Sequence, residues 1–261
     1  MGVDRDRAAR RAVTAGAHTR GTRPAPAEVP AAFDGGAHRY DLLVGINPGY
    51  HAHLRLSARR LGLPAPGTGL RVLDLGCGTG ASTAALLATL PEAHVVAVDA
   101  SAGMLAQARR KSWPARVCFV HARAEELDRI AEHGPFDAVF AAYLVRNLPE
   151  PDSVLRGLHA VLRPGAPLVV HDYSLAGPLR RWIWHAVSWG VIIPAGRLAT
   201  GDTGLYRHLW RSVLDFDDPV AFRDRLRRAG YRDVRAGTVP GWQRGIVHTF
   251  RARRPDTPEE G

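Results

Sequence analysis

A short glycine-rich segment has the residue types that bind a small ligand through backbone groups. It reads Val72-Leu73-Asp74-Leu75-Gly76-Cys77-Gly78-Thr79-Gly80. Glycine has no Cβ, so a ligand can approach the chain closely there. A second acid, Asp99, ends the run Val96-Ala97-Val98-Asp99, 19 residues after Gly80. A carboxylate in that place can accept both hydroxyls of a ribose.

The spacing of the glycines decides among the ligands. Gly76-x-Gly78-x-Gly80 differs from the G-x-G-x-x-G fingerprint of dinucleotide sites, which argues against a nicotinamide cofactor. Acidic side chains nearby favour a cationic ligand. The pattern predicts S-adenosylmethionine, and a tight turn without any ligand is the alternative. The residues predicted to hold it here are Asp74, Gly76, Gly78, Gly80, Asp99, Ala100 and Met104, of which Met104 would also suit an ordinary core position.

A glycine loop of this kind needs a strand before it and a helix after it. From residue 70 onward, apolar runs typical of strands alternate with helical segments, as in a parallel sheet covered by helices on both faces. The expected strands are 71–75, 94–98, 117–120, 136–141, 168–172, 233–239 and 245–253, and the expected helices are 82–90, 102–110, 151–162 and 219–229. We therefore predict an α/β fold, a Rossmann-like doubly wound sheet that is mostly parallel, with an antiparallel strand near the C-terminus. An inserted helical region over 175–216 would cover the substrate.

Composition indicates one large domain with a tail at each end. The chain has 261 residues and 46% hydrophobic residues, enough for a sizeable core. Residues 1–30 are rich in Arg, Ala, Gly and Pro and are predicted to be a disordered tail, with an organellar transit peptide as the alternative. The single domain spans 31–253, and 254–261 form a C-terminal tail. The two cysteines have no zinc-site spacing, so we expect no metal and a reducing, cytoplasmic setting.

The net charge of +10 favours acidic partners such as nucleic acid or an anionic membrane surface, although a solvated arginine-rich surface is the more common reason for such a charge. No recognisable RNA-binding module is present, so we expect no nucleic-acid partner. The longest apolar run, 182–195, is shorter than the roughly 20 residues that span a bilayer. Its tryptophans suit either a lipid interface or an apolar pocket. Peripheral membrane contact and the oligomeric state stay open.

Further motifs give the chain a family resemblance. It resembles class I methyltransferases and, over about 33–251, the ubiquinone/menaquinone biosynthesis C-methyltransferase family. Besides the glycine loop and Asp99, the matching segments are Phe33-Asp34, Tyr40-Asp41, Val145-Arg146-Asn147-Leu148, Ile192-Ile193-Pro194-Ala195-Gly196, Tyr206-Arg207-His208-Leu209 and Gly245-Ile246-Val247. The resemblance implies metal-independent transfer of a methyl group to a ring carbon of a lipophilic, polyprenylated hydroquinone.

Four residues are candidates for the chemistry. Arg146 would stabilise a developing phenolate, and Asn147 would orient the ring oxygen. Tyr40 would contribute from an N-terminal cover, and His171, which precedes Asp172, would accept a proton. The structural alternatives are a solvated arginine, a helix-capping asparagine and a buried, hydrogen-bonded histidine.

Two positions depart from the family pattern. Arg123 stands where the family's acid would contact the adenine amino group, and arginine cannot accept a hydrogen bond. Glu125 or Glu126 could take that role, with Ala124 offering its backbone N–H. Near the C-terminus, His248 follows Gly245 by three residues rather than five. The second interpretation is therefore an O-, N- or C-methyltransferase of a small aromatic natural product. The third is an RNA-binding methyltransferase or a cofactor-binding regulatory protein that uses the arginine-rich surface.

Overall fold

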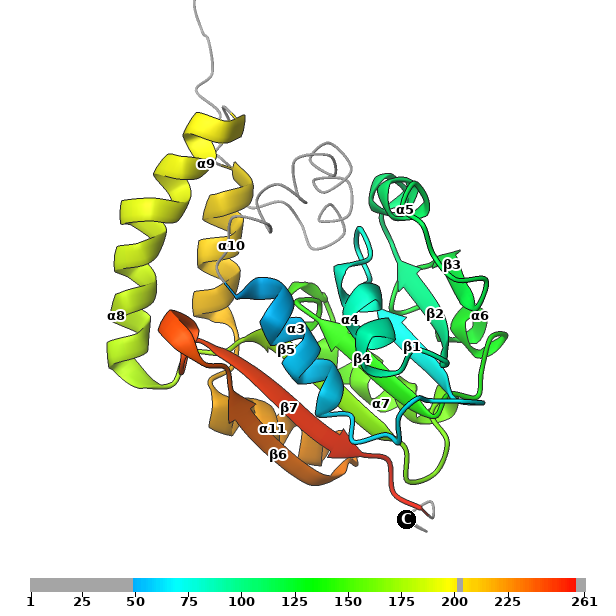
Figure 1. The fold of residues 1–261 in the computed structure, drawn as a ribbon. Coiled ribbons are helices and arrows are strands. Elements are labelled where there is room, and N and C mark those ends of the chain that lie inside the picture. The colour runs from blue at the N-terminus through cyan, green and yellow to red at the C-terminus, as the bar shows by residue number, and fades with distance from the viewer. Residues whose placement is uncertain (1–48, 201–203, 257–261) are drawn as a thin grey trace, which may run out of the picture.

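The computed structural model describes residues 49–200 and 204–256, which build a seven-stranded sheet with helices on both faces (Figure 1). The strands are β1 (Arg71–Leu75), β2 (His94–Asp99), β3 (Val117–His121), β4 (Ala138–Ala142), β5 (Pro167–Tyr173), β6 (Arg232–Thr238) and β7 (Val247–Arg253). Their order is β3-β2-β1-β4-β5-β7-β6. The first five strands are parallel, and β7 runs antiparallel to both β5 and β6. The predicted Rossmann-like architecture is confirmed.

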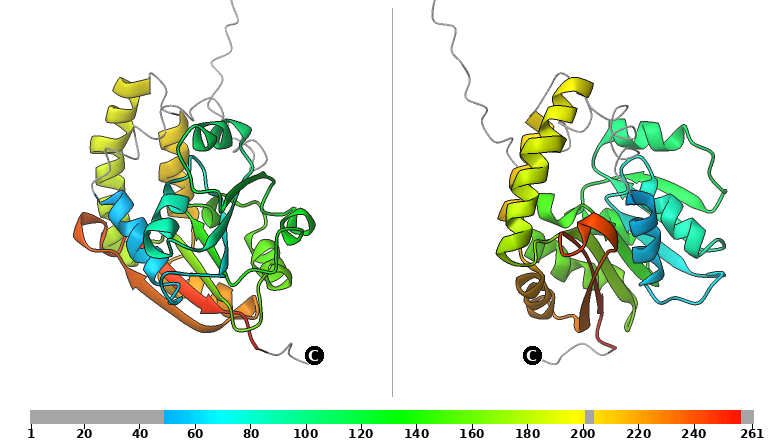
Figure 2. Two further views of the ribbon diagram at one scale, coloured as in Figure 1. Left: turned by 45° about the vertical axis from the view of Figure 1, so that its right-hand side comes forward. Right: turned by 60° about the vertical axis from the view of Figure 1, so that its left-hand side comes forward.

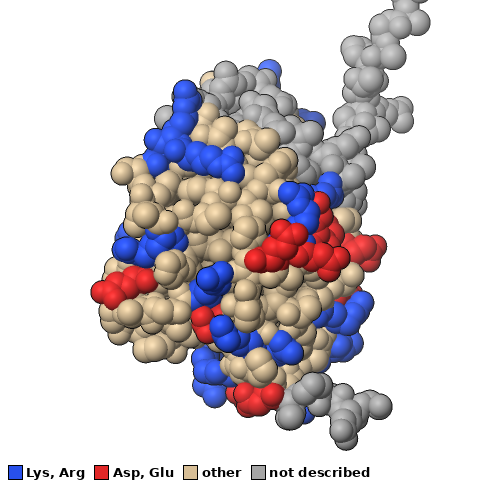
Figure 3. All heavy atoms as spheres, turned by 90° about the vertical axis from the view of Figure 1, so that its right-hand side faces the viewer, with Lys and Arg blue, Asp and Glu red and all other residues tan. Residues whose placement is uncertain are grey.

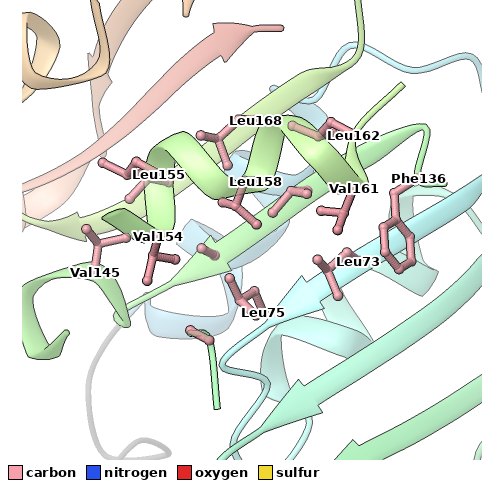
Figure 4. Packing of buried hydrophobic residues seen from close by; sticks show 14 of the residues in the cluster. Leu73, Leu75, Phe136, Val145, Val154, Leu155, Leu158, Val161, Leu162 and Leu168 are labelled. Carbon is pink, nitrogen blue, oxygen red and sulfur yellow. The ribbon is translucent and has the colours of Figure 1, made fainter. Parts of the chain in front are cut away.

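Each face of the sheet has its own apolar core. On one face α6 (Leu127–Ala131), α7 (Pro151–Val161) and α11 (Pro219–Arg228) contribute to a cluster that includes Leu73, Val139 and Phe250 of the sheet. Figure 4 shows Leu155 and Leu158 of α7 lying over the strands. On the other face α3 (Tyr50–Arg59) and α4 (Ala81–Thr89) pack on strand residues of opposite parity, and α5 (Ala102–Arg109) contacts β2 and β3. Strands covered on both sides explain the continuous apolar runs in the sequence.

The region predicted as an insert is helical. It comprises α8 (Gly177–Val187), the π-helical turn η3 (Ser188–Ile192), α9 (Ile193–Thr200) and α10 (Gly204–Asp215). Figure 2 shows α8, η3 and α9 as one nearly continuous rod on the outside of the molecule. Within the described residues, no helix combines the length and the apolar character needed to cross a membrane.

Several predicted boundaries were wrong. Strand β4 is Ala138–Ala142 rather than 136–141, because Phe136 pairs instead with the chain after α7, as an isolated bridge to Leu162. Strand β7 begins at Val247 rather than 245, since the preceding residues form a turn. Helices α3 and α6 were not predicted. The polar residues of α3 obscure its apolar face, and α6 is only five residues long. The predicted tail 1–30 lies outside the described residues.

Candidate cofactor and active site

A pocket opens at the carboxyl ends of β1 and β4, where the strand order reverses and where open α/β sheets bind ligands. Its walls come from the glycine loop, the end of β2, the loop after β3 and the segment after β4. Six of the eight residues predicted to hold the cofactor line it: Gly76, Gly78, Asp99, Ala100, Met104 and Ala124. Separate segments of the sequence thus meet around one cavity.

Asp99 joins the glycine loop to the start of α5. Its Oδ2 accepts a hydrogen bond from the backbone N–H of Gly78 at 2.7 Å, and its Oδ1 accepts one from that of Ser101 at 2.9 Å. The Ser101 hydroxyl in turn accepts from the N–H of Met104 at 3.0 Å and caps α5. The carboxylate is therefore held in one orientation at the edge of the pocket.

Two glycines of the loop have different reasons to lack a side chain. Gly78 has φ +54°, and a Cβ built there would meet no atom within 4 Å, so the space above it is open pocket. Gly80 has φ +93°, and a Cβ there would lie 2.6 Å from the Trp113 ring. Gly78 therefore leaves room for a ligand in the pocket. Gly80 does not line the pocket, and it leaves room for the Trp113 ring.

Asp74 lies beneath the loop and does not line the pocket. It is fully buried, and its Oδ2 accepts hydrogen bonds from Ser82 Oγ at 2.8 Å and Thr83 Oγ1 at 2.6 Å. Burial raises the pKa of Asp74 to about 7. This acid therefore ties β1 to the first turn of α4 and supports the loop from below.

The loop after β3 places one acid in the pocket and a second one elsewhere. Arg123 and Glu125 both line the pocket and form an ion pair, with Nε 3.6 Å from Oε2. Glu126 instead accepts hydrogen bonds from the backbone N–H of Arg123 and from Arg129. These hydrogen bonds lower the pKa of Glu126. Of the two acids considered from the sequence, Glu125 is the one at the pocket.

Tyr143, which follows β4 directly, links the pocket to a buried polar network. It lines the pocket with its backbone at φ +56°, an uncommon conformation for a residue other than glycine. Its hydroxyl lies 3.1 Å from His171 Nε2. His171 Nδ1 lies 2.8 Å from Ser57 Oγ, which is 2.7 Å from Thr249 Oγ1. The network therefore connects β4, β5, β7 and α3.

His171 belongs to this network and not to the pocket wall. It is fully buried, and burial lowers its pKa to about 3, so the imidazole is neutral near neutral pH. The Tyr143 ring lies against it, with centroids 4.9 Å apart. The geometry favours the buried structural histidine over the predicted direct proton acceptor.

The depressed pKa of His171 should make stability pH-dependent. The unfolded state takes up this proton near pH 6.5 but the folded state only near pH 3, so the stability contributed by neutral His171 is lost as pH falls through this window. We expect the free energy of unfolding of the wild type to fall more steeply there than that of His171→Gln, by at most about 1.4 kcal/mol per pH unit. Urea denaturation at several pH values in this window measures how the free energy of unfolding of each protein changes with pH. Asp74 is present in both proteins, so its contribution to that change is the same in both and cancels in the comparison. Equal slopes would contradict the expectation.

Arg146 makes a buried ion pair. Its Nη1 lies 2.5 Å from Asp172 Oδ1 and donates to the carbonyl oxygen of Tyr143 at 2.9 Å. The Arg146 side chain is 7% exposed and that of Asp172 is 0% exposed. This burial does not fit the alternative interpretation of Arg146 as a solvated arginine. Among the described residues, the pocket is lined by the neighbouring Asn147 and not by Arg146. Arg146 fixes the chain after β4 to the end of β5.

Asn147 reaches the pocket with one polar atom still available. Its Nδ2 donates to the carbonyl oxygen of Tyr143 at 3.2 Å. Its Oδ1 is buried and has no hydrogen-bond partner among the described residues. A buried acceptor without a partner is costly, so this oxygen suits a hydroxyl or amine donated by a ligand.

Comparison with known proteins identifies the family. A model described as a methyltransferase domain matches residues 72–165. The demethylmenaquinone methyltransferase of Clavibacter sepedonicus is 34% identical over 233 residues, which cover 88% of this chain and 91% of that protein. The ubiquinone/menaquinone biosynthesis C-methyltransferase UbiE of Bradyrhizobium diazoefficiens is 33% identical and covers 82% of this chain and 86% of its own length. The chain belongs to the ubiquinone/menaquinone biosynthesis C-methyltransferase family.

This C-methyltransferase family member is an S-adenosylmethionine-dependent methyltransferase. A solved structure of Haemonchus contortus phosphoethanolamine N-methyltransferase 2 with S-adenosylhomocysteine has the same fold. Its TM-score is 0.60 at 18% identity, and the match covers 90% of this chain and 60% of that one. The cofactor suits the pocket described above, because the open space over Gly78 admits a close ligand and Asp99 presents an anionic acceptor beside it.

In the described ranges 49–200 and 204–256 of this methyltransferase, no group of three His, Cys, Asp or Glu side chains could hold a metal ion. Tyr40, predicted as part of the acceptor site, lies outside those ranges. His248 and Phe250 share a face of β7, as predicted, with ring centroids 6.0 Å apart. They lie on the opposite face of β7 from Thr249, the residue hydrogen-bonded in the His171 network.

Sequence reasoning missed Tyr143, which lines the pocket of this methyltransferase, and the buried aromatic residues packed near it. Tyr50 of α3 stacks on Tyr143 with centroids 5.4 Å apart, and Tyr173 of β5 lies 5.3 Å from the same ring. Trp184 of α8 lies 5.0 Å from Tyr173 and is fully buried. One signal was available for Tyr143, since it follows a parallel strand at the edge where ligands collect. Tyr50 had none, because its helix was not predicted.

Proposed function

We propose that this methyltransferase methylates a ring carbon of a lipophilic quinol of the polyprenyl type. The observation that carries the proposal is that Tyr143, with its aromatic side chain, and Asn147, whose Oδ1 has no hydrogen-bond partner among the described residues, line the same pocket as the cofactor residues. Flat aromatic surfaces favour a ring-shaped acceptor. The names of the relatives, demethylmenaquinone methyltransferase among them, support the same acceptor class.

The reaction needs a carbon nucleophile next to the transferable methyl group. S-adenosylmethionine supplies an electrophilic methyl group. A hydroquinone carbon becomes nucleophilic when a neighbouring phenolic proton is removed or strongly hydrogen-bonded. We assign the partnerless Oδ1 of Asn147 to accept a hydrogen bond from a ring hydroxyl, and so to orient the ring. Holding ring and methyl group in line supplies much of the acceleration.

We assign supporting roles to Tyr143 and Arg146, which lie close to Asn147. The contact between the Tyr143 hydroxyl and neutral His171 fixes the position of Tyr143 at the pocket wall. Arg146, engaged with Asp172, holds the segment that carries Tyr143 and Asn147 and is assigned here as a positioning residue. This changes the role expected from the sequence, which was direct stabilisation of a phenolate.

At the other end of the pocket, we propose that Glu125 takes the place of the family's acid. Its carboxylate lines the cavity, whereas that of Glu126 is used within the loop. Glu125 can accept a hydrogen bond from the adenine amino group, and its ion pair with Arg123 orients the carboxylate. The assignment explains how an arginine is tolerated at position 123.

Incubation with labelled S-adenosylmethionine tests the acceptor. We expect label in reduced demethylmenaquinol and none in the oxidised quinone, because only the quinol has the phenolic hydroxyls that activate the ring carbon. Mass spectrometry of the extracted product should show one added methyl group with both hydroxyls still exchangeable, as carbon methylation requires. Methylation of small phenols but of no polyprenyl quinol would favour the natural-product alternative. Label in RNA would favour the third interpretation.

A further inference from the structure

The α8–η3–α9 rod carries five large exposed apolar side chains, here called the apolar ridge. Its members and their exposed fractions are Leu179 at 64%, Trp182 at 68%, Trp189 at 48%, Val191 at 61% and Leu198 at 90%. The inner side of the same rod is packed, since Trp184, Ser188 and Ile193 are buried. The rod thus satisfies its core contacts and still presents a second apolar face.

Arginines are frequent in the rod and in the neighbouring helix α10. The segment 177–215, from the start of α8 to the end of α10, contains five arginines, Arg180, Arg181, Arg197, Arg207 and Arg211, and two acids, Asp202 and Asp215. Arg207 lies over the Trp189 ring at 5.9 Å, so cation and aromatic ring are direct neighbours. On the face of the molecule away from the rod, acidic and basic side chains are interspersed (Figure 3).

We propose that the apolar ridge is a peripheral membrane-binding surface for anionic phospholipids. Tryptophans beside arginines on one face of a helix are the composition that settles at the headgroup boundary, with the apolar side chains entering the acyl region. Anionic headgroups complement the arginines. Since no described helix is able to span the bilayer, the contact is interfacial.

A second copy of this chain fits the ridge less well. A two-fold interface places the same patch against itself, so the arginines of one rod would face those of the other. Like charges across an interface oppose association. The charge pattern therefore favours a lipid surface over self-association. The inference does not depend on which acceptor the enzyme methylates.

Vesicle flotation of the full chain tests the proposal. We expect the wild type to bind vesicles of phosphatidylcholine with phosphatidylglycerol, and to bind phosphatidylcholine alone weakly. High salt should weaken the binding, because it screens the arginines. The triple variant Trp182→Ser, Trp189→Ser, Leu198→Ser should lose affinity for the anionic vesicles by at least about tenfold. Val220→Ser is the matched control, since Val220 is 56% exposed but lies on α11, and it should bind as the wild type does.

Unchanged affinity of the variant for S-adenosylmethionine, measured by calorimetry, shows that the triple variant is folded. Vesicle binding of the triple variant equal to that of the wild type would overturn the proposal, as would failure of the wild type to bind anionic vesicles. Sedimentation velocity gives the remaining outcome. A wild-type dimer that the triple substitution converts to monomer, without any effect on vesicle binding, would assign the ridge to a second copy of the chain and overturn the proposal too.

Discussion

Replacing Arg146 with alanine should lower the free energy of unfolding by about 3–5 kcal/mol, because it leaves the Asp172 carboxylate buried without its partner. Burial already raises the pKa of Asp172, and the Arg146 guanidinium opposes that rise. Without the arginine the pKa should rise further, so Asp172 becomes protonated at higher pH. The destabilisation should therefore shrink as pH is lowered. Urea denaturation at several pH values measures the effect.

Two further variants distinguish the destabilisation caused by loss of the buried ion pair from the effect of removing any arginine. Arg227→Ala removes an exposed pair, in which the side chains of Arg227 and Asp224 are 52% and 47% exposed, and should cost less than about 1 kcal/mol. Adding Asp172→Asn to Arg146→Ala removes the stranded charge and should restore part of the lost stability. A destabilisation by Arg146→Ala no larger than that by Arg227→Ala would refute the assigned role. Turnover of Arg146→Ala should fall even where the protein is folded, because Asn147 loses its support.

Replacing Asp99 with alanine should weaken S-adenosylmethionine binding by about tenfold to a hundredfold. The substitution removes the anionic acceptor at the pocket and also the two hydrogen bonds that pin Gly78 and Ser101. Hydrogen bonds to charged groups contribute about 1.5–3 kcal/mol each, and about 1.4 kcal/mol is a factor of ten. Isothermal titration calorimetry gives the dissociation constant directly.

Asp99→Asn should fall between the wild type and Asp99→Ala, because the amide keeps one acceptor oxygen but not the charge. Asp128→Ala removes an exposed acid of α6 and should leave affinity unchanged. An Asp99→Ala protein that binds the cofactor as the wild type does would show that the ribose contact is made elsewhere.

The part of the site that could be predicted from sequence is the part built by local motifs. The glycine loop and Asp99 each lie at a strand end that the apolar pattern locates, so their meeting in one pocket follows from parallel topology. Glu125 and Glu126 could not be separated in advance. Which of them faces the pocket depends on the path of a short loop, and Glu126 folds back on the N–H of Arg123.

The part that could not be predicted depends on contacts between distant segments. The burial of His171 requires Ser57 from α3 and Thr249 from β7, which lie 114 and 78 residues away in sequence. The ion pair between Arg146 and Asp172 requires β4 and β5 to be neighbours.

The antiparallel pairing of β7 with β5 has a consequence for synthesis. Strand β5 carries His171 and Asp172, and the edge of β5 that faces away from β4 pairs with β7. The residues of β7 follow about 80 positions later in the sequence, so they are synthesised last. A nascent chain that has passed β5 therefore presents an exposed apolar strand edge until translation reaches Arg253. Such edges pair readily with other chains. Truncation within the α8–α11 region should therefore leave this edge of β5 unpaired, and we expect such a fragment to aggregate more readily than the full chain.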